Sequence, residues 1–555
     1  MILNPITNLT AMKTRFTLLA FLLLCITGLN AQTGFFGGQG VPLKPQSPLF
    51  GYDVLINDQL SQNQRMLDVC SAFNGWLYAI YSHSESDGPW VAILKSINNG
   101  KTWSIIWDEN SGSFGDSFTR LNLISTGNDT SNLYLFMSGC LFHQSSLIQN
   151  GFVSRFNCSS GLFEDGILND DSHKMRDISI SSDIIYPAVG SIPYSIAVVY
   201  SKAKDFGVGD TVIFASSSNG GMSFNFRIGV ASSLKYFNRV SLAYGRSPSW
   251  SSGRYFAAWE EKLTSASTIG HIYTSHSEPN FNSSFTKPIC LDSLDPSAIN
   301  RARNPIISCQ VNNSDNDSAN LTEVVLFEKY KPSGGDYDVT GFYNLQATTT
   351  SHFRPLNIAA TSNNELQPDI SFNPYNSKFM VTYFDSTVKK LPFMTNDISL
   401  ANPNSWNVVS QGYNDNSNLV APYPKVEVNF GNQDGMNAWI SEGTGGNGIA
   451  LFDAPYSTYT GVSENNIGTS AKLIGSYPNP CSNTIKIVFE LKNAGRVTIN
   501  VTGIMGQALG TVTDQNYPAG RHVVQYNVSG IPGGNYIYKF RSGDFTTTGK
   551  FTVIR

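Results

Sequence analysis

Leu67–Phe73 reads LDVCSAF and Trp76–Ser82 reads WLYAIYS, and this pair of short segments decides the fold of the chain. In both segments apolar and aromatic residues alternate with polar or small ones, which is typical of β-strands with one buried face. A short turn separates them. We therefore expect the first two strands of a small antiparallel sheet here.

The same strand pair occurs seven times, with copies that start about every 55 to 65 residues. Each copy adds two further strands after the pair. The other copies begin at Leu121, Asp177, Val240, Ile306, Asp369 and Lys425. A lone four-stranded sheet cannot bury both of its faces, whereas sheets packed face to face around an axis can, and such a ring leaves only short edges. The repeat therefore predicts a β-propeller. An array of β-sandwiches is the alternative, but the even spacing and the lack of linkers favour the propeller.

The sequence predicts an all-β protein with two domains. A seven-bladed β-propeller covers residues 65–455, and a small C-terminal Ig-like β-sandwich covers residues 473–555. Residues 32–64 form a lead-in, and a Ser/Thr/Asn-rich linker covers 456–472. The seventh copy lacks its fourth strand after Gly448–Ala454. Tyr52–Asp58 (YDVLIND) has no blade of its own, so we expect it to pair there and close the ring.

The N-terminal residues 1–31 have the layout of a secretory signal peptide. Lys13 and Arg15 precede the apolar run Phe16–Leu29, and Ala31 offers a small residue for cleavage. The run is short for a membrane span, and no other long apolar stretch exists. We therefore predict no integral membrane segment after removal of the signal.

The composition and the residue patterns limit the classes of binding partner and of metal or cofactor chemistry that we predict for the protein. Charged residues make up only 14% of the chain, and the formal net charge is −4, so no nucleic-acid partner is predicted. The sequence has no CxxC and no HExxH pattern, and its histidines are scattered, so we predict no metal site and no cofactor. Six cysteines lie outside the signal peptide. The near pairs Cys140–Cys158 and Cys290–Cys309 are candidates for disulfides in an exported protein.

Two turns carry a second pattern, each between the third and fourth strands of its copy. The first contains Ser96, Asn98, Gly100, Thr102 and Trp103, and the second contains Ser217, Asn219, Gly221, Ser223 and Phe224. Both resemble the Asp-box (BNR repeat) of sialidase-like propellers, with asparagine in place of aspartate. The expected role is structural: the amide side chain bonds to the turn, glycine takes a positive φ, and the aromatic ring packs between sheets.

Five arginines stand just before or at the start of the first strand of their copies, and they are Arg65, Arg120, Arg176, Arg239 and Arg303. In a propeller this position lines one mouth of the central channel. The functional interpretation is a ring that binds a carboxylate or a sulfate. The structural interpretation is that the arginines pair with acids between blades, such as Asp68 and Asp177.

The resemblance to sialidases implies a fold and not an activity. Sialidases bind a sugar carboxylate with three arginines and use a Tyr–Glu pair and an acid–base aspartate. Here Arg65 is followed by Met66 and Leu67 and not by Ile-Pro, and no Tyr–Glu pair can be assigned, so the catalytic residues are unknown. Glu260 and Glu261 are candidates only by position. We predict a non-catalytic propeller that binds a glycan or a protein; the alternative is an exo-sialidase-like glycoside hydrolase that acts on anionic sugars.

The C-terminal segment Leu473–Arg555 resembles the sorting domain of the type IX secretion system along nearly its whole length. The matching elements include Tyr477–Pro480, Gly495–Val501 and Ser529–Tyr538. Physically the segment is expected to form seven short strands with alternating polarity. The resemblance implies the type IX machinery as a partner, and a secreted or outer-surface location that is reached through the periplasm.

Overall fold

The computed structural model describes residues 53–554, apart from gaps at 58–62, 86, 128–132, 171–174, 184–194, 204–209, 233, 247–252, 278–284, 295–300, 312–320, 348–351, 399–402, 415–418, 421, 443–446, 455–470, 478–480, 492, 504–506 and 544. The predicted signal peptide and most of the predicted linker lie outside these residues. The chain divides into two compact units between Ser457 and Thr458. Across the described residues, no helix combines the length and the apolar character needed to cross a membrane.

The first unit is built from four-stranded antiparallel sheets, and the described residues contain seven of them. The first sheet consists of β2 (Arg65–Ser71), β3 (Leu77–Glu85), β4 (Gly88–Ser96) and β5 (Ser104–Asn110). The second sheet consists of β6 (Ser117–Thr126), β7 (Tyr134–His143), β8 (Ile148–Asn157) and β9 (Leu162–Asp170). The third sheet consists of β10 (Met175–Ser182), β11 (Ile196–Lys202), β12 (Asp210–Ser217) and β13 (Asn225–Ser232). The fourth sheet consists of β14 (Tyr236–Gly245), β15 (Arg254–Lys262), β16 (Gly270–His276) and β17 (Ile289–Cys290). The fifth sheet consists of β18 (Ala302–Cys309), β19 (Glu323–Lys331), β20 (Asp336–Asn344) and β21 (Arg354–Ala359). The sixth sheet consists of β22 (Glu365–Asn373), β23 (Lys378–Asp385), β24 (Phe393–Asn396) and β25 (Asn407–Ser410).

The seventh sheet joins the two ends of the unit. It contains β26 (Lys425–Asn429), β27 (Asp434–Glu442), β28 (Gly448–Asp453) and, as its outer strand, β1 (Val54–Leu55). β1 runs antiparallel to β28, with Val54 opposite Phe452, and the Ile56 amide donates to the Ala450 carbonyl at 3.0 Å. This is the pairing expected for Tyr52–Asp58, of which residues 53–57 are described.

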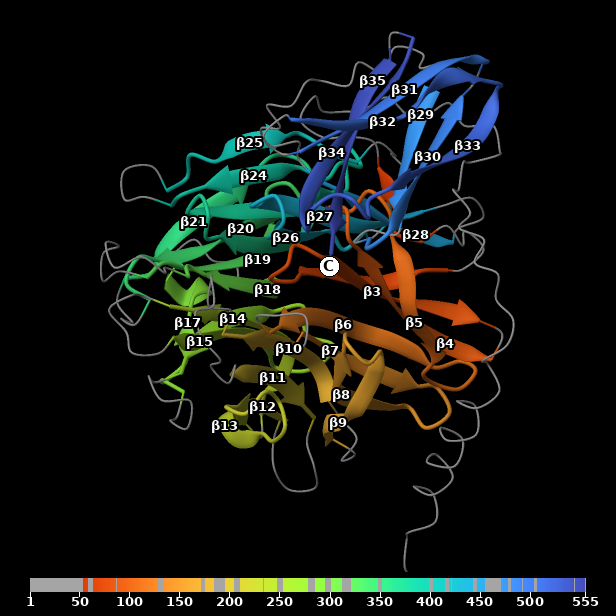
Figure 1. Ribbon diagram of the computed structural model, residues 1–555. Helices are drawn as coiled ribbons and strands as arrows, with labels where there is room; N and C mark the ends of the chain where they lie inside the picture. The colour runs from red at the N-terminus through yellow and green to blue at the C-terminus, as the bar shows by residue number, and fades with distance from the viewer. Residues whose placement is uncertain are drawn as a thin grey trace, which may run out of the picture. The chain divides into compact units, whose positions relative to one another are not determined.

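The first strands follow one another in cyclic order, because β2 contacts β6, each later first strand contacts the next, and β26 contacts β2. In Figure 1 the first strands β6, β10, β14 and β18 lie nearer the centre of the unit than the fourth strands β9, β13 and β21. Side chains bond one first strand to the next: Asp68 Oδ2 accepts from the Leu123 amide and Asp369 Oδ2 from the Val426 amide, both at 2.8 Å. The order closes where the Phe430 amide donates to Ser71 Oγ.

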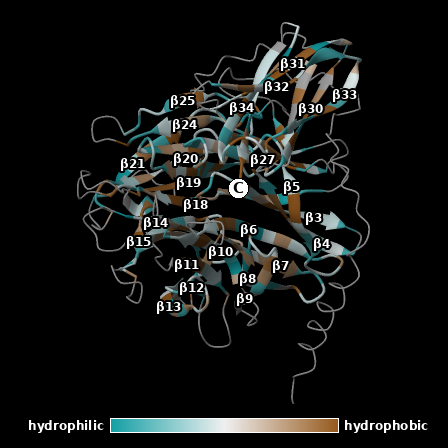
Figure 2. Ribbon diagram, in the orientation of Figure 1, coloured by the Kyte–Doolittle hydropathy of each residue, from teal (hydrophilic) through white to brown (hydrophobic). Residues whose placement is uncertain are grey.

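The core of the first unit lies between neighbouring sheets and not in one central mass. One buried cluster joins Tyr78 and Ile93 of the first sheet to Leu121 and Leu135 of the second, and further clusters join the later sheets. Figure 2 shows apolar residues along the strands of these sheets. A sheet of this kind is stable only when its neighbours cover both faces.

The described residues of the second unit form seven strands in two sheets. Its strands are β29 (Ala471–Tyr477), β30 (Thr484–Leu491), β31 (Gly495–Gly503), β32 (Ala508–Tyr517), β33 (Gly520–Asn527), β34 (Gly534–Ser542) and β35 (Phe545–Val553). The sheet orders are β29-β30-β33 and β32-β31-β34-β35, and both sheets contribute to one buried cluster. Alternation explains this core: Val497, Ile499 and Val501 are buried on one face of β31.

The disulfide candidates are wrong, since all six described cysteines are free. Cys140 lies opposite Gly151, whereas Cys158 follows Asn157 at the far end of the same hairpin, where Asn157 lies opposite Tyr134. Six strand residues separate these ends by roughly 20 Å, too far for a disulfide. Cys290 and Cys309 lie in different sheets, in β17 and β18.

Candidate functional site

The five arginines lie in the first strands, as the sequence predicts: Arg65 in β2, Arg120 in β6, Arg176 in β10, Arg239 in β14 and Arg303 in β18. Each lies at or next to a register shift in the pairing of the first and second strands. A bulge of this kind changes the direction in which side chains point. The location of the arginines is therefore regular, but their orientation depends on the bulge.

The arginines fall into two registers relative to this bulge. Arg239 itself has a positive φ of 40°, whereas Arg65 and Arg303 directly precede the positive-φ residues Met66 and Asn304. Arg239 therefore differs from Arg65 and Arg303 in its position relative to the bulge.

Arg176 and Arg303 are each held by their own carboxylate and aromatic ring. Arg176 forms an ion pair with Asp210 and lies 3.6 Å from the Tyr236 ring centroid. Arg303 Nε donates to Glu328 Oε2 at 2.6 Å, and its guanidinium lies 3.8 Å from the Tyr337 centroid. The combination of a paired carboxylate and a cation–π contact stabilises these charges without a ligand.

Arg120 and Arg239 lie near Asp177, which is almost fully buried. Arg120 Nε is 3.7 Å from Asp177 Oδ1, and Asp177 Oδ2 accepts from the Val240 amide at 2.8 Å. Asp177 was expected as a partner of the arginines, whereas Asp68, also expected, lies 3.5 Å from Lys425 Nζ. The structural interpretation of the arginines therefore holds for Arg120.

Arg239 lies within electrostatic reach of acidic groups from several sheets. Burial opposes its charge, but Asp177, Tyr423, Glu260 and Glu328 outweigh this effect and raise the pKa of Arg239. Among the described residues, Arg239 forms no ion pair within 4.0 Å. We call Arg120, Asp177, Arg239, Glu260, Glu328 and Tyr423 the channel-mouth cluster, after the position that the sequence predicts for the arginines.

Two further carboxyl groups, those of Asp369 and Glu427, lie on the first strands β22 and β26. Burial raises the pKa of Asp369 to about 6 and that of Glu427 to about 7. Lys425 and the Val426 amide partly counteract this at Asp369. Glu427 Oε1 accepts from Ser371 Oγ at 2.9 Å and from the Val428 amide at 2.8 Å. A carboxyl group that titrates near neutrality can act as a proton donor.

Several of these residues were missed by the sequence analysis. Glu260 was considered only by position, and Glu328, Asp369 and Glu427 were not considered. The sequence could have indicated Glu260 and Glu328, because each lies late in the second strand of its copy. Glu260 lies opposite Asn238, and Glu328 lies opposite Arg303. The anion-binding role of the five arginines stays a prediction, and Arg176 and Arg303 already have acidic partners.

The two turns that resemble Asp-boxes have the same hydrogen bonds. In the first, Gly100 N donates to Ser96 Oγ and Thr102 N to Asn98 Oδ1, both at 2.9 Å. The second repeats this through Ser217, Asn219, Gly221 and Ser223 at 2.9 and 3.1 Å. Gly100 and Gly221 have φ values of 82° and 80°. The turns join β4 to β5 and β12 to β13, the third and fourth strands of their sheets.

The aromatic residues of these turns pack against other sheets. The Trp103 ring lies 5.4 Å from that of Phe452 in β28, in an edge-on arrangement. Phe224 packs against the buried cluster shared by the second and third sheets. Both contacts fit a structural role, since each connects its turn to a neighbouring sheet.

Comparisons with known proteins address the two units differently. Residues 476–554 match the model of the secretion system C-terminal sorting domain. This tail marks the chain for export by the type IX secretion system to the cell surface or the outside. A comparison with curated protein sequences gives no match.

Solved structures resemble the chain at low identity. An α-L-arabinofuranosidase of Fusarium graminearum with an iminosugar inhibitor has 12% identity and a TM-score of 0.43, covering 74% of this chain and 98% of that one. The phage phi92 endosialidase has 11% identity and a TM-score of 0.40, covering 84% and 75%, respectively. A protein of unknown function from Dyadobacter fermentans has 10% identity and a TM-score of 0.38, covering 74% and 100%. At these scores the likeness carries no argument about activity.

The class that emerges is an exported all-β protein whose first unit consists of repeated four-stranded sheets and whose second unit carries the sorting signal. The sorting domain shows that the chain is exported. In the first unit, the channel-mouth cluster is the candidate functional site.

Proposed function

We propose that the first unit is a seven-bladed β-propeller of the Asp-box type, that the second is a small Ig-like module, and that the protein binds a carbohydrate outside the cell at its channel-mouth cluster. The cyclic order of the first strands and the paired Asp-box-like turns support the fold. One observation carries the function: Arg239, which forms no ion pair among the described residues, lies within electrostatic reach of Asp177, Glu260 and Glu328. These acids pair with Arg120, Lys262 and Arg303, respectively.

The ligand is a sugar rich in hydroxyl groups. Carboxylates accept hydrogen bonds from hydroxyls and the guanidinium donates to them, so a cluster of mixed charge suits a neutral glycan. A ring for anions would need arginines free of acids, whereas Arg120, Arg176 and Arg303 pair with Asp177, Asp210 and Glu328. We therefore expect neutral glycans to bind more tightly than sialylated or sulfated ones.

A glycan array with the purified protein tests this proposal. Arg239→Ala should reduce binding at least about tenfold, as expected for the loss of a charged hydrogen-bonding group in a buried site. Arg227→Ala is the matched control, because Arg227 lies exposed on the outer strand β13 of the same unit. Equal binding by both variants would contradict the proposal. Binding only to anionic glycans, weakening as salt rises, would restore the anion-ring interpretation.

Hydrolysis is the second candidate, favoured by the raised pKa values of Asp369 and Glu427. Glycosidases of the common kind need one carboxyl group that is protonated near neutrality and a second that is ionised. Chromogenic glycosides of the bound sugars would reveal turnover. Glu427→Gln should then abolish it and leave binding intact, whereas no turnover of any bound sugar leaves the protein a binder.

A further inference from the structure

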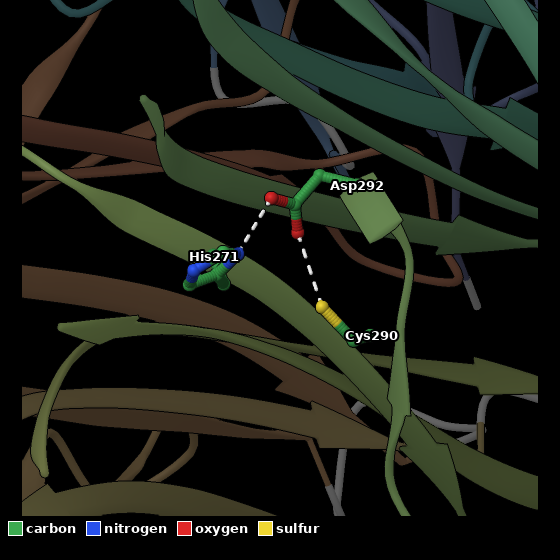
Figure 3. A group of neighbouring side chains, drawn as sticks. All are labelled: His271, Cys290 and Asp292. Carbon is green, nitrogen blue, oxygen red and sulfur yellow. Dashed lines mark hydrogen bonds and ion pairs between the residues drawn. The ribbon is translucent and has the colours of Figure 1, made fainter. Parts of the chain in front are cut away.

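Three side chains capable of binding a metal converge at the outer part of the fourth sheet. His271 lies in β16, Cys290 ends β17, and Asp292 begins the short 3-10 helix η1 (Asp292–Leu294). The potential ligand atoms of all three lie within 4.8 Å of one another. Figure 3 shows the Asp292 carboxylate between the imidazole of His271 and the thiol of Cys290. The channel-mouth cluster uses none of these residues.

The Asp292 carboxylate organises the group. Its Oδ2 accepts from His271 Nδ1 at 2.9 Å, and its Oδ1 accepts from the Cys290 thiol at 3.3 Å. The Ile272 amide donates to Oδ1 at 2.9 Å, and Asp292 is only 3% exposed, so the carboxylate is held in place. Supported carboxylates of this kind orient metal ligands well.

The surroundings favour an added positive charge. Burial and the Asp292 carboxylate raise the pKa of the Cys290 thiol, since both disfavour the thiolate. Glu261 faces His271 across the sheet, with only Lys235, 2.8 Å away, as its described ion-pair partner. Tyr273 lies opposite Cys290 in the same sheet. A cation at this place would therefore meet one carboxylate at once and a second one nearby.

We propose that His271, Cys290 and Asp292 form a binding site for Zn²⁺. One nitrogen, one sulfur and one oxygen ligand suit this ion, and three protein ligands leave a fourth position for water. Tetrahedral Zn²⁺ with bonds of about 2.0 to 2.3 Å needs ligand atoms about 3.3 to 3.7 Å apart. The widest separation in the group, up to 4.8 Å, must therefore shorten by roughly 1 Å, whereas Asp292 Oδ2 already lies 2.9 Å from His271 Nδ1. The His271 side chain is 27% exposed, which gives the ion a route from solvent.

Binding exchanges protons in a defined way. The Cys290 thiol loses its proton to buffer, and the His271 imidazole moves its proton from Nδ1 to Nε2. Asp292 exchanges two hydrogen bonds for a metal bond and keeps the Ile272 amide. One proton is therefore released for each Zn²⁺ bound.

Titration calorimetry of the chelator-treated full chain with ZnCl₂ tests the site. We expect one Zn²⁺ per chain, and titrations in two buffers with different ionisation enthalpies should show the release of about one proton. Cys290→Ser and His271→Ala should each weaken binding by about tenfold or more. The control is Cys158→Ser, because Cys158 is also a half-buried free cysteine but has no place in the three-residue group.

Cobalt substitution identifies the ligand atom directly. Co²⁺ bound to thiolate should give a near-ultraviolet charge-transfer band, absent from Cys290→Ser and retained in Cys158→Ser. Melting curves of each variant establish that it is folded. No binding by the wild-type protein overturns the proposal, as does equal Zn²⁺ affinity of Cys290→Ser, His271→Ala and Cys158→Ser.

Discussion

Replacing Gly100 by alanine tests whether the first and last sheets close on each other. Gly100 has a φ of 82°, and an added Cβ would lie 2.0 and 2.4 Å from Cε1 and Cζ of Phe452. The Phe452 ring is 2% exposed and packs on Trp103, so it has little room to move. The left-handed conformation costs about 1–2 kcal/mol and the overpacking about 1–3 kcal/mol. We therefore expect a loss of about 2–5 kcal/mol in the free energy of unfolding.

Gly335→Ala is the matched control, since Gly335 has a φ of 72° but an added Cβ would meet nothing within 4 Å. It should cost only about 1–2 kcal/mol. Denaturant unfolding followed by tryptophan fluorescence measures both variants. In a double-mutant cycle, Gly100→Ala should cost less in a Phe452→Ala background, because the clash has gone. Equal losses for Gly100→Ala and Gly335→Ala would refute the contact between these sheets.

Three other predictions follow from the structure. Burial raises the pKa of Glu323 to about 8, so the folded state binds the Glu323 proton more tightly than the unfolded state does. The resulting contribution to the free energy of unfolding is fully present below the unfolded pKa of about 4.3 and is lost as the pH rises toward 8. Glu323→Gln should flatten that decline in denaturation midpoints between pH 5 and 8.5, whereas parallel curves would contradict the assignment. Deletion of Leu473–Arg555 should leave the protein in the periplasm, as fractionation would show; truncated protein at the surface or in the medium would disprove the role of the tail. Ile56→Ala should reduce the stability of the first unit by about 2–5 kcal/mol, because Ile56 is buried beside the strand that completes the seventh sheet, and an unchanged melting temperature would argue against that strand.

The strands were predictable because their signal is local. Alternation in Leu67–Phe73 reports one buried face whatever the sheet packs against, and seven repetitions of that signal indicate the architecture. The missing strand of the seventh copy likewise indicated the partner for Val54–Leu55. The disulfide candidates failed because they rested on nearness in sequence, whereas Cys140 and Cys158 lie toward opposite ends of a hairpin.

By itself, the sequence determined the repeated strand pairs, the Asp-box-like turns and the sorting tail, since each depends on residues within a few positions of one another. Only the tertiary structure decided which acid each arginine meets. Arg120 lies beside Asp177 of the next sheet and Arg176 beside Asp210 of its own, because bulges at the starts of the first strands set the side-chain directions. The grouping of His271 with Cys290 and Asp292 was likewise decided by tertiary structure, because antiparallel pairing and a following turn join residues that the linear spacing keeps apart.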